Sequence, residues 1–282
     1  KISKHIMKNN PNVEAFDEFG FILWYYLPVA YYQYLEGNLK STASKIGSGP
    51  VFYFSPNHTE ANKHFDPPLL HHYLTTEHKN VCYGLKSPKF TDNKWTPPPF
   101  KDFYKNDKYI YDKPILTIHN KNTKEWGRHP HNYFNGEILE KMFSTFENDY
   151  QIIYIRPPDK SDSYKLQIDT GQGTLDIGDK EVLKRHPSVI NIETLLHETD
   201  KTYNEVQFMI LANSEHHLTP AGDAVIPSYF GGDVFIYNCP RCISALRGVW
   251  KTGSWMEKLS GSKIYGFNNY NELLINAKDK WL

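Results

Sequence analysis

Short apolar runs of strand length alternate with segments of helical periodicity throughout the second half of this chain. The apolar runs predict strands at residues 114–118, 151–155, 189–192, 216–219 and 234–237. Helices are expected at residues 136–146, 203–213, 227–230 and 272–281. Two parallel strands need a crossover between them, usually a helix, and such crossovers are right-handed. The alternation therefore predicts an α/β fold built on a parallel sheet.

Two of these helices carry clear local signals. The apolar side chains of 136–146 fall on one helical face: Ile138, Leu139, Met142, Phe143 and Phe146. The helix over 203–213 is preceded by Thr202 and has Glu205 three residues further on, which is the pattern of a capping box. Both patterns favour helices that pack against the sheet.

The first half of the chain is less regular. We predict a helix over 21–34, strands over 51–55 and 80–85, and a polar loop that begins at Pro56. Residues 87–113 are rich in Pro, Lys and Asp, and their run of three prolines suits neither a helix interior nor a central strand. We therefore expect two lobes, residues 1–105 and 106–282, with the last helix as a candidate to cross back to the first lobe.

Charge and cysteine content limit the partners. The 32 basic and 32 acidic residues balance, which argues against a nucleic-acid scaffold or a polybasic membrane binder. Three cysteines, two of them in a C-x-x-C at Cys239 and Cys242, fit a reducing compartment, and no second such pair completes a zinc site. The longest apolar stretch, residues 19–32, is too short to cross a bilayer. We expect a cytoplasmic protein without stable membrane insertion, metal or cofactor, in the host cytoplasm if the protein is viral.

The loops that follow the predicted strands supply the candidate ligand contacts, because ligands of open parallel sheets bind at the carboxyl ends of the strands. Lys121 lies in the loop after 114–118, and Arg156 directly follows 151–155. The turn around Gly222 leads into a short helix, whose N-terminus favours an anion. Only five of the 32 basic residues are arginines, and arginine binds phosphate bidentately. Together these groups suit a diphosphate; alternatively, Arg156 pairs with Asp159 or Asp176.

Several common motifs are missing from the sequence. The chain has no complete phosphate-binding P-loop and no G-x-G-x-x-G dinucleotide fingerprint. It also lacks the G-x-S-x-G nucleophile motif, H-E-x-x-H and Asp-x-Asp. Titratable residues do gather after the predicted strand 51–55, where His58, Glu60 and Asp66 are candidates for a general base. The alternative for these three is an ordinary hydrogen-bonded loop.

Residues 190–238 read as strand, capped helix, short strand, glycine turn, short helix and strand. This order resembles the nucleotide-binding, Rossmann-like lobe of GT-B glycosyltransferases. The segments YFSPNHTE, IHNKNTKEWGRHPHNYF and IIYIRP are similar to uncharacterised glycosyltransferase-like proteins of microbial and large-DNA-virus genomes. The resemblance covers residues 113–282. GT-B enzymes are usually longer than this chain, so the resemblance implies an abbreviated N-terminal lobe.

The resemblance implies a metal-independent glycosyltransferase of glycan biosynthesis, a hexosyl- or pentosyltransferase. The C-terminal lobe would bind a nucleotide-sugar donor and the N-terminal lobe a glycan or other hydroxyl acceptor. The implied donor-binding residues are His119, Asn120, Lys121, Arg156, Thr219, Gly222, Tyr229, Arg241 and Arg247. The alternatives are a non-catalytic glycan-binding protein on the same fold and another GT-B-like enzyme, such as an epimerase.

Overall fold

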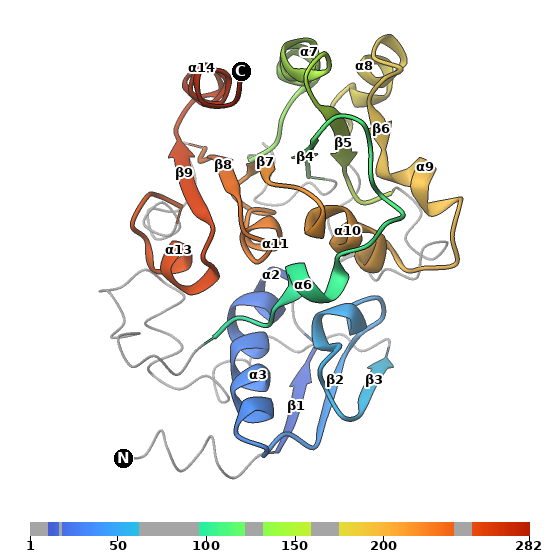
Figure 1. The fold of residues 1–282 in the computed structure, drawn as a ribbon, viewed down its shortest axis with the longest axis vertical. Coiled ribbons are helices and arrows are strands. Elements are labelled where there is room, and N and C mark those ends of the chain that lie inside the picture. The colour runs from blue at the N-terminus through green and yellow to red at the C-terminus, as the bar shows by residue number, and fades with distance from the viewer. Residues whose placement is uncertain (1–10, 17–18, 62–95, 122–131, 159–174, 240–249) are drawn as a thin grey trace.

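The computed structural model describes residues 11–16, 19–61, 96–121, 132–158, 175–239 and 250–282. Within them the chain forms an α/β structure with two separate parallel sheets, one of three strands and one of six (Figure 1). The predicted class, α/β with a parallel sheet, is confirmed.

The large sheet comes from the second half of the chain. Its strands are β4 (Ile115–His119), β5 (Gln151–Ile155), β6 (Ile190–Asn191), β7 (His216–Pro220), β8 (Asp233–Tyr237) and β9 (Lys263–Phe267). They lie in the order β6-β5-β4-β7-β8-β9, and all neighbours pair in parallel. Numbered by appearance, this order is 3-2-1-4-5-6, the arrangement of doubly wound nucleotide-binding sheets. Every residue of β4 is buried, as a central parallel strand requires.

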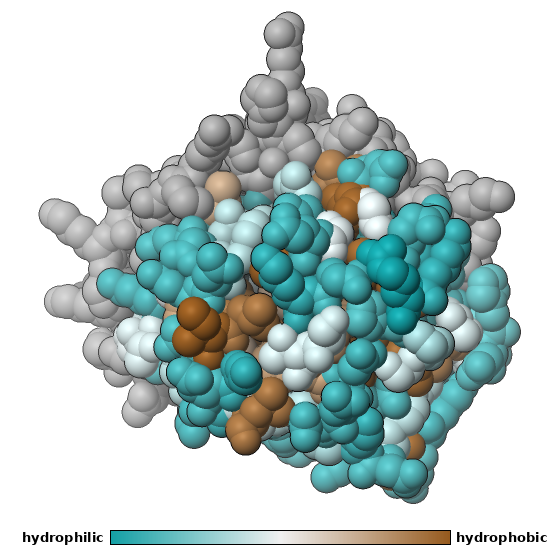
Figure 2. Space-filling view, turned by 90° about the horizontal axis from the view of Figure 1, so that it is seen from above, coloured by the Kyte–Doolittle hydropathy of each residue, from teal (hydrophilic) through white to brown (hydrophobic). Residues whose placement is uncertain are grey.

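Helices cover both faces of the large sheet. One face carries α7 (Gly136–Phe146), α8 (Asp179–Arg185) and α14 (Tyr270–Trp281), whose buried side chains share a hydrophobic core with Leu116 and Ile118 of β4. The other face carries α9 (Ile192–Leu196), α10 (Tyr203–Ala212), α11 (Val225–Ser228) and α13 (Trp255–Ser260). The final helix α14 lies beside α7, so the suggestion that it crosses back to the first lobe is wrong (Figure 1). Seen from the side of α7, α8 and α14, the surface is mostly hydrophilic with small apolar spots (Figure 2).

The small sheet is made of β1 (Asn12–Ala15), β2 (Ser41–Lys45) and β3 (His58–Ala61). A helical stretch precedes β2 and consists of α2 (Phe19–Phe21), the π-helical η1 (Ile22–Tyr26) and α3 (Leu27–Leu35). The predicted strand at 51–55 is wrong, because η2 (Gly49–Phe52) is a 3₁₀ helix, and the predicted polar loop contains β3. Val51 and Phe52 are buried without a ladder, and an apolar run by itself does not separate these cases. The predicted strand 80–85 lies outside the described residues.

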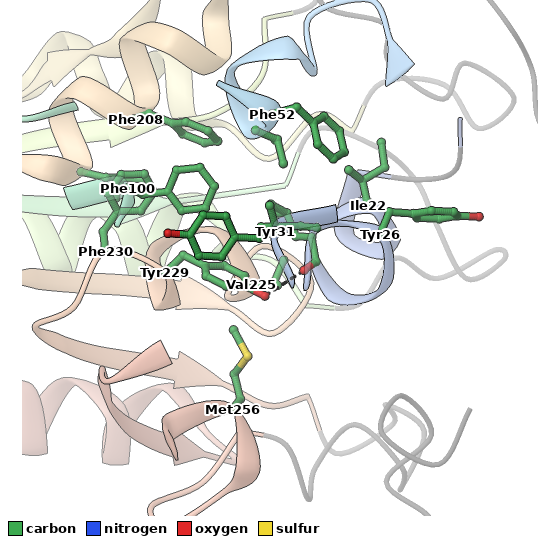
Figure 3. Close-up of a cluster of buried hydrophobic side chains, with 14 of the residues drawn as sticks. Ile22, Tyr26, Tyr31, Phe52, Phe100, Phe208, Val225, Tyr229, Phe230 and Met256 are labelled. Carbon is green, nitrogen blue, oxygen red and sulfur yellow. Dashed lines mark hydrogen bonds between the residues drawn. The ribbon is translucent and has the colours of Figure 1, made fainter. Parts of the chain in front are cut away.

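A single hydrophobic core joins the two sheets. The short helix α6 (Phe100–Tyr104) lies between them, and Phe100 packs on Phe208 of α10 and on Phe230 with ring centroids 5.5 and 5.6 Å apart. Figure 3 shows this junction between the two sheets, where side chains of η1 and α3 pack against side chains of α10 and α11. Tyr229 donates its hydroxyl across the junction to the carbonyl oxygen of Leu23 at 2.8 Å. The expected boundary at residues 105 and 106 thus falls between two sheets that share one core.

Candidate ligand site at the carboxyl edge of the large sheet

The strand order reverses between β4 and β7, since the chain leaves β4 towards β5 on one side and leaves β7 towards β8 on the other. Such a switch point is where open parallel sheets bind ligands. The register pairs Ile118 with Leu218 and so places His119 beside Thr219 at the carboxyl edge. The structure thus places two predicted donor residues, His119 and Thr219, at the ends of neighbouring strands, and three others, Asn120, Lys121 and Gly222, in the segments that follow those strands.

His119 is a neutral imidazole in this edge. Burial alone lowers its pKa to about 3, and its Nε2 atom has no hydrogen-bond partner among the described residues. Two residues earlier on β4, Thr117 Oγ1 lies 2.7 Å from Nδ1 of His217, its neighbour on β7. Burial also lowers the pKa of His217. An unpartnered buried polar atom costs about 1–3 kcal/mol, which a hydrogen bond from a ligand would offset.

Asn120 closes the base of the segment between β4 and α7. Its Oδ1 accepts from the main-chain N–H of Phe134 at 2.9 Å, and its Nδ2 donates to the Phe134 carbonyl at 2.8 Å. The same Oδ1 accepts from Lys121 N at 2.9 Å, and Nδ2 donates to the Tyr154 hydroxyl at 3.2 Å. With all these contacts inside the protein, Asn120 shapes the edge that would carry a ligand.

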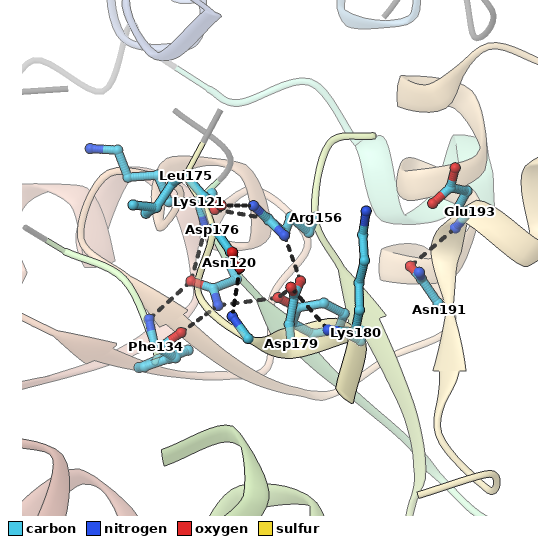
Figure 4. A network of polar contacts seen from close by, with 12 residues as sticks. Asn120, Lys121, Phe134, Arg156, Leu175, Asp176, Asp179, Lys180, Asn191 and Glu193 are labelled. Atoms are coloured by element: carbon cyan, nitrogen blue, oxygen red, sulfur yellow. Dashed lines mark hydrogen bonds and ion pairs between the residues drawn. The ribbon is translucent and has the colours of Figure 1, made fainter. Parts of the chain in front are cut away.

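Arg156 is buried in the same network, with the geometry shown in Figure 4. Its Nη1 donates to Asp179 Oδ2 at 2.6 Å, its Nε donates to the Lys121 carbonyl at 3.1 Å, and its Nη2 donates to the Leu175 carbonyl. Burial raises the pKa of Tyr154 well above its usual range, so that its hydroxyl stays protonated and donates to Asp179 Oδ2 at 3.0 Å. The ion-pair partner of Arg156 is therefore Asp179, which the sequence did not indicate.

The N-terminus of α7 is closed by the protein's own chain. The Gly136 N–H donates to the Ile177 carbonyl at 2.9 Å, and the Ile138 N–H donates to Asn135 Oδ1 at 2.9 Å. A Cβ at Gly136 would lie 3.1 Å from that Ile177 oxygen, so glycine permits the close approach. In dinucleotide-binding proteins the pyrophosphate lies at the N-terminus of this first helix. A phosphate ligand at this edge must therefore use other groups.

The turn after β7 offers some of those groups. Gly222 is exposed, and a Cβ built on it meets nothing within 4 Å, so its backbone is accessible. Ala221 donates to the Tyr237 carbonyl at 3.0 Å, and Thr219 Oγ1 donates to the Pro220 carbonyl at 3.0 Å. Tyr229, also predicted to bind the donor, lies instead in the junction. Arg241 and Arg247 lie outside the described residues.

The candidates for a general base lie in the small sheet. His58 stacks on Phe52, and its ring nitrogens lie 2.7 Å from Thr42 Oγ1 and 3.2 Å from Ser44 Oγ. Burial lowers the pKa of His58, although the nearby Glu60 raises it in part. The Glu60 carboxylate accepts from Gly47 N at 3.0 Å and from Gly49 N. Both residues thus hold the β2–η2 turn, and Asp66 lies outside the described residues.

That turn links the small sheet to the large one. The Asn204 side chain, in the first turn of α10, donates to the Gly47 carbonyl at 2.6 Å. Thr202 and Glu205 form the predicted capping box at the same helix end. The carboxyl end of β2 therefore reaches the N-terminus of α10. Sequence reasoning missed Asn204 and Asp179, and their positions in the first turns of two helices were the only local signal.

Comparisons with known protein-family models, with curated proteins and with solved structures find no match. Within the described ranges, no three His, Cys, Asp or Glu side chains come together as a metal site. Across the same ranges, no helix is long and apolar enough to span a bilayer.

Proposed function

We propose that this protein transfers a sugar from a nucleotide-sugar donor to a hydroxyl acceptor, and that the donor binds at the carboxyl edge between β4 and β7. One observation carries the proposal: the switch point of a doubly wound sheet brings His119, Lys121 and Gly222 to a single edge. A neutral hydrogen-bonding side chain, a cation and an accessible main-chain turn suit a sugar diphosphate. The fold alone hosts many functions, so the site residues bear the argument.

In this proposal the protein works without a metal ion. Lys121 stabilises the negative charge that develops on the leaving nucleoside diphosphate, which is the part that a metal plays in other transferases. The small sheet takes the place of the acceptor lobe in a GT-B arrangement, joined to the donor lobe where Gly47 meets Asn204. His58, Glu60 or Asp66 removes the acceptor proton. On a defined acceptor, loss of that base lowers turnover about 10²–10⁴-fold.

Thermal shift against UDP-, GDP-, CMP- and TDP-sugars, followed by calorimetry, tests the donor site. We expect one donor class to raise the melting temperature, with or without EDTA. Lys121→Ala should weaken its binding about 10- to 150-fold, the equivalent of about 1.5–3 kcal/mol. Lys141→Ala, which removes an exposed lysine that pairs with Glu137 on α7, is the matched control and should bind normally. If no donor changes the melting temperature, the proposal fails.

A non-catalytic glycan-binding protein is the second candidate, and one observation favours it. Phe103 is 55% exposed and stacks on Tyr53 with ring centroids 3.8 Å apart, while Tyr34 is 43% exposed. Exposed aromatic rings suit the apolar faces of sugars. This candidate predicts that Phe103→Ala abolishes binding to a glycan array and that nucleotide-sugars have no effect.

A further inference from the structure

We infer that Asp179 and Arg156 are positioning residues, which hold the main chain of Lys121 in place at the carboxyl edge and do not themselves contact the ligand. The inference deepens the proposed function. It rests on that function only for the UDP titration described below. It revises the role predicted for Arg156, which was direct contact with the diphosphate.

The contacts form a closed ring around the end of β4. Asn120 Nδ2 donates to the Tyr154 hydroxyl, which donates to Asp179 Oδ2. Asp179 Oδ2 also accepts from Arg156, whose Nε reaches the Lys121 carbonyl. The ring closes because the Lys121 N–H donates back to Asn120 Oδ1. Both main-chain groups of Lys121 are thereby held by buried side chains.

The charges inside the ring are matched. The side chains of Arg156 and Asp179 are 9% and 7% exposed, and their charged atoms lie 2.6 Å apart. The second carboxylate oxygen, Oδ1, accepts from the Lys180 N–H at 3.1 Å. All three guanidinium nitrogens of Arg156 already donate within the protein. Arg156 is thus neutralised where it lies. The Lys121 side chain points away from the ring (Figure 4).

The two roles for Arg156 make opposite predictions for Asp179. If Arg156 bound phosphate directly, Asp179→Asn would remove a competing anion, and nucleotide binding would be unchanged or tighter. If the pair positions Lys121, Asp179→Asn leaves a buried guanidinium without its counter-charge and loosens the edge as much as Arg156→Gln does. Residues that act as one network also give non-additive effects.

The test combines amide hydrogen exchange of the apo protein with UDP titration by calorimetry. We expect Asp179→Asn and Arg156→Gln each to speed exchange at the Lys121 amide at least ~10-fold and to weaken UDP binding by a similar factor, with the double variant no worse than either. Arg156→Lys should restore part of the loss. Tyr154→Phe removes one contact of the ring and serves if the charge variants fail to fold, with a smaller change in the same direction.

His186→Gln is the control. It removes a buried histidine that links α8 to α7 through Glu147 and Glu140, so it costs stability without touching the edge. We expect normal Lys121 exchange and normal UDP affinity in that variant. Unchanged Lys121 exchange in Asp179→Asn, or UDP binding that is kept there but lost in Arg156→Gln, overturns the inference. If the wild type binds none of UDP, GDP, CMP and TDP, the donor proposal is at fault, and the exchange measurement still decides the positioning role.

Discussion

The side-chain amide of Asn204 donates to the main-chain carbonyl of Gly47 at 2.6 Å, and this buried hydrogen bond joins the first turn of α10 to the small sheet. Together with the contact of Tyr229 with Leu23 and the aromatic packing around Phe100, it makes the interface between the two sheets part of a core. Interfaces of this kind resist independent motion, whereas polar interfaces between lobes allow it.

The shared core predicts one cooperative unfolding transition. Trp24 lies in the helical stretch of the small sheet and Trp281 at the end of α14, so Trp24→Phe and Trp281→Phe each remove one local fluorophore. Guanidinium unfolding followed by fluorescence in both variants, and by circular dichroism, should give coincident transitions in each variant. Asn204→Ala and Tyr229→Phe should each lower stability by about 1–3 kcal/mol, because each removes a buried hydrogen bond across the junction. Two separated transitions would show that the lobes fold independently.

Gly266 in β9 tolerates no side chain. A Cβ at this position would lie 1.9 Å from the Trp250 carbonyl oxygen and 2.6 Å from Asn238 Nδ2, so the backbone itself must move. We expect Gly266→Ala to lower the free energy of unfolding, measured by chemical denaturation, by about 1–3 kcal/mol. Gly222→Ala is the matched control: its Cβ meets nothing, and the change should stay within about 0.5 kcal/mol. Equal effects of the two substitutions would contradict the steric argument.

The low pKa of buried His119 predicts that the protein becomes less stable at acid pH. Its pKa is about 3 when folded, against about 6.5 when unfolded, so the unfolded chain binds more protons between these values. The contribution of His119 to the free energy of unfolding is fully present above about pH 6.5. It is lost as the pH falls towards 3, by up to about 1.4 kcal/mol per pH unit. His119→Gln should flatten the fall of the unfolding free energy over this window. A wild-type slope in His119→Gln would refute the assignment.

His186 predicts the opposite pH dependence. Burial lowers its pKa, but the hydrogen bonds to Glu147 and Glu140 outweigh burial, and the net pKa is raised. The folded state therefore holds a proton that the unfolded chain releases. The stabilisation is complete below about pH 6.5 and disappears as the pH rises through the raised folded value.

Unfolding of His186→Gln at pH 6 and pH 9 checks this prediction. The loss of free energy relative to wild type should be larger at pH 6, because only the protonated ring forms charged contacts with both carboxylates. Arg185→Gln, which removes an exposed pair with Glu140, should cost at most about 1 kcal/mol at either pH. A loss in His186→Gln that is the same at both pH values would mean that the ring acts only by packing.

Local patterns were reliable where neighbours in the chain set the structure. The helix at 136–146 and the strand at 151–155 agree with the structure to the residue, and the capping box at Thr202 is present. The prediction of a strand at residues 51–55 was wrong, because a short apolar run is buried both in a central strand and in a 3₁₀ helix that packs on the core. The polar strand Ser41–Lys45 gave no apolar signal, since only pairing with β1 and β3 makes it a strand.

The candidate site divides in the same way. The sequence by itself determined that Lys121 and Gly222 follow strands of a parallel sheet and that His119 lies at the end of one, because hydrophobic periodicity and crossover handedness are local rules. Only the tertiary structure decided that β4 and β7 are neighbours, that Asp179 neutralises Arg156, and that the chain closes the N-terminus of α7. Those facts depend on how the helices pack against the sheet, because the ion-pair partner of a buried charge is set by tertiary packing and not by its neighbours in the sequence.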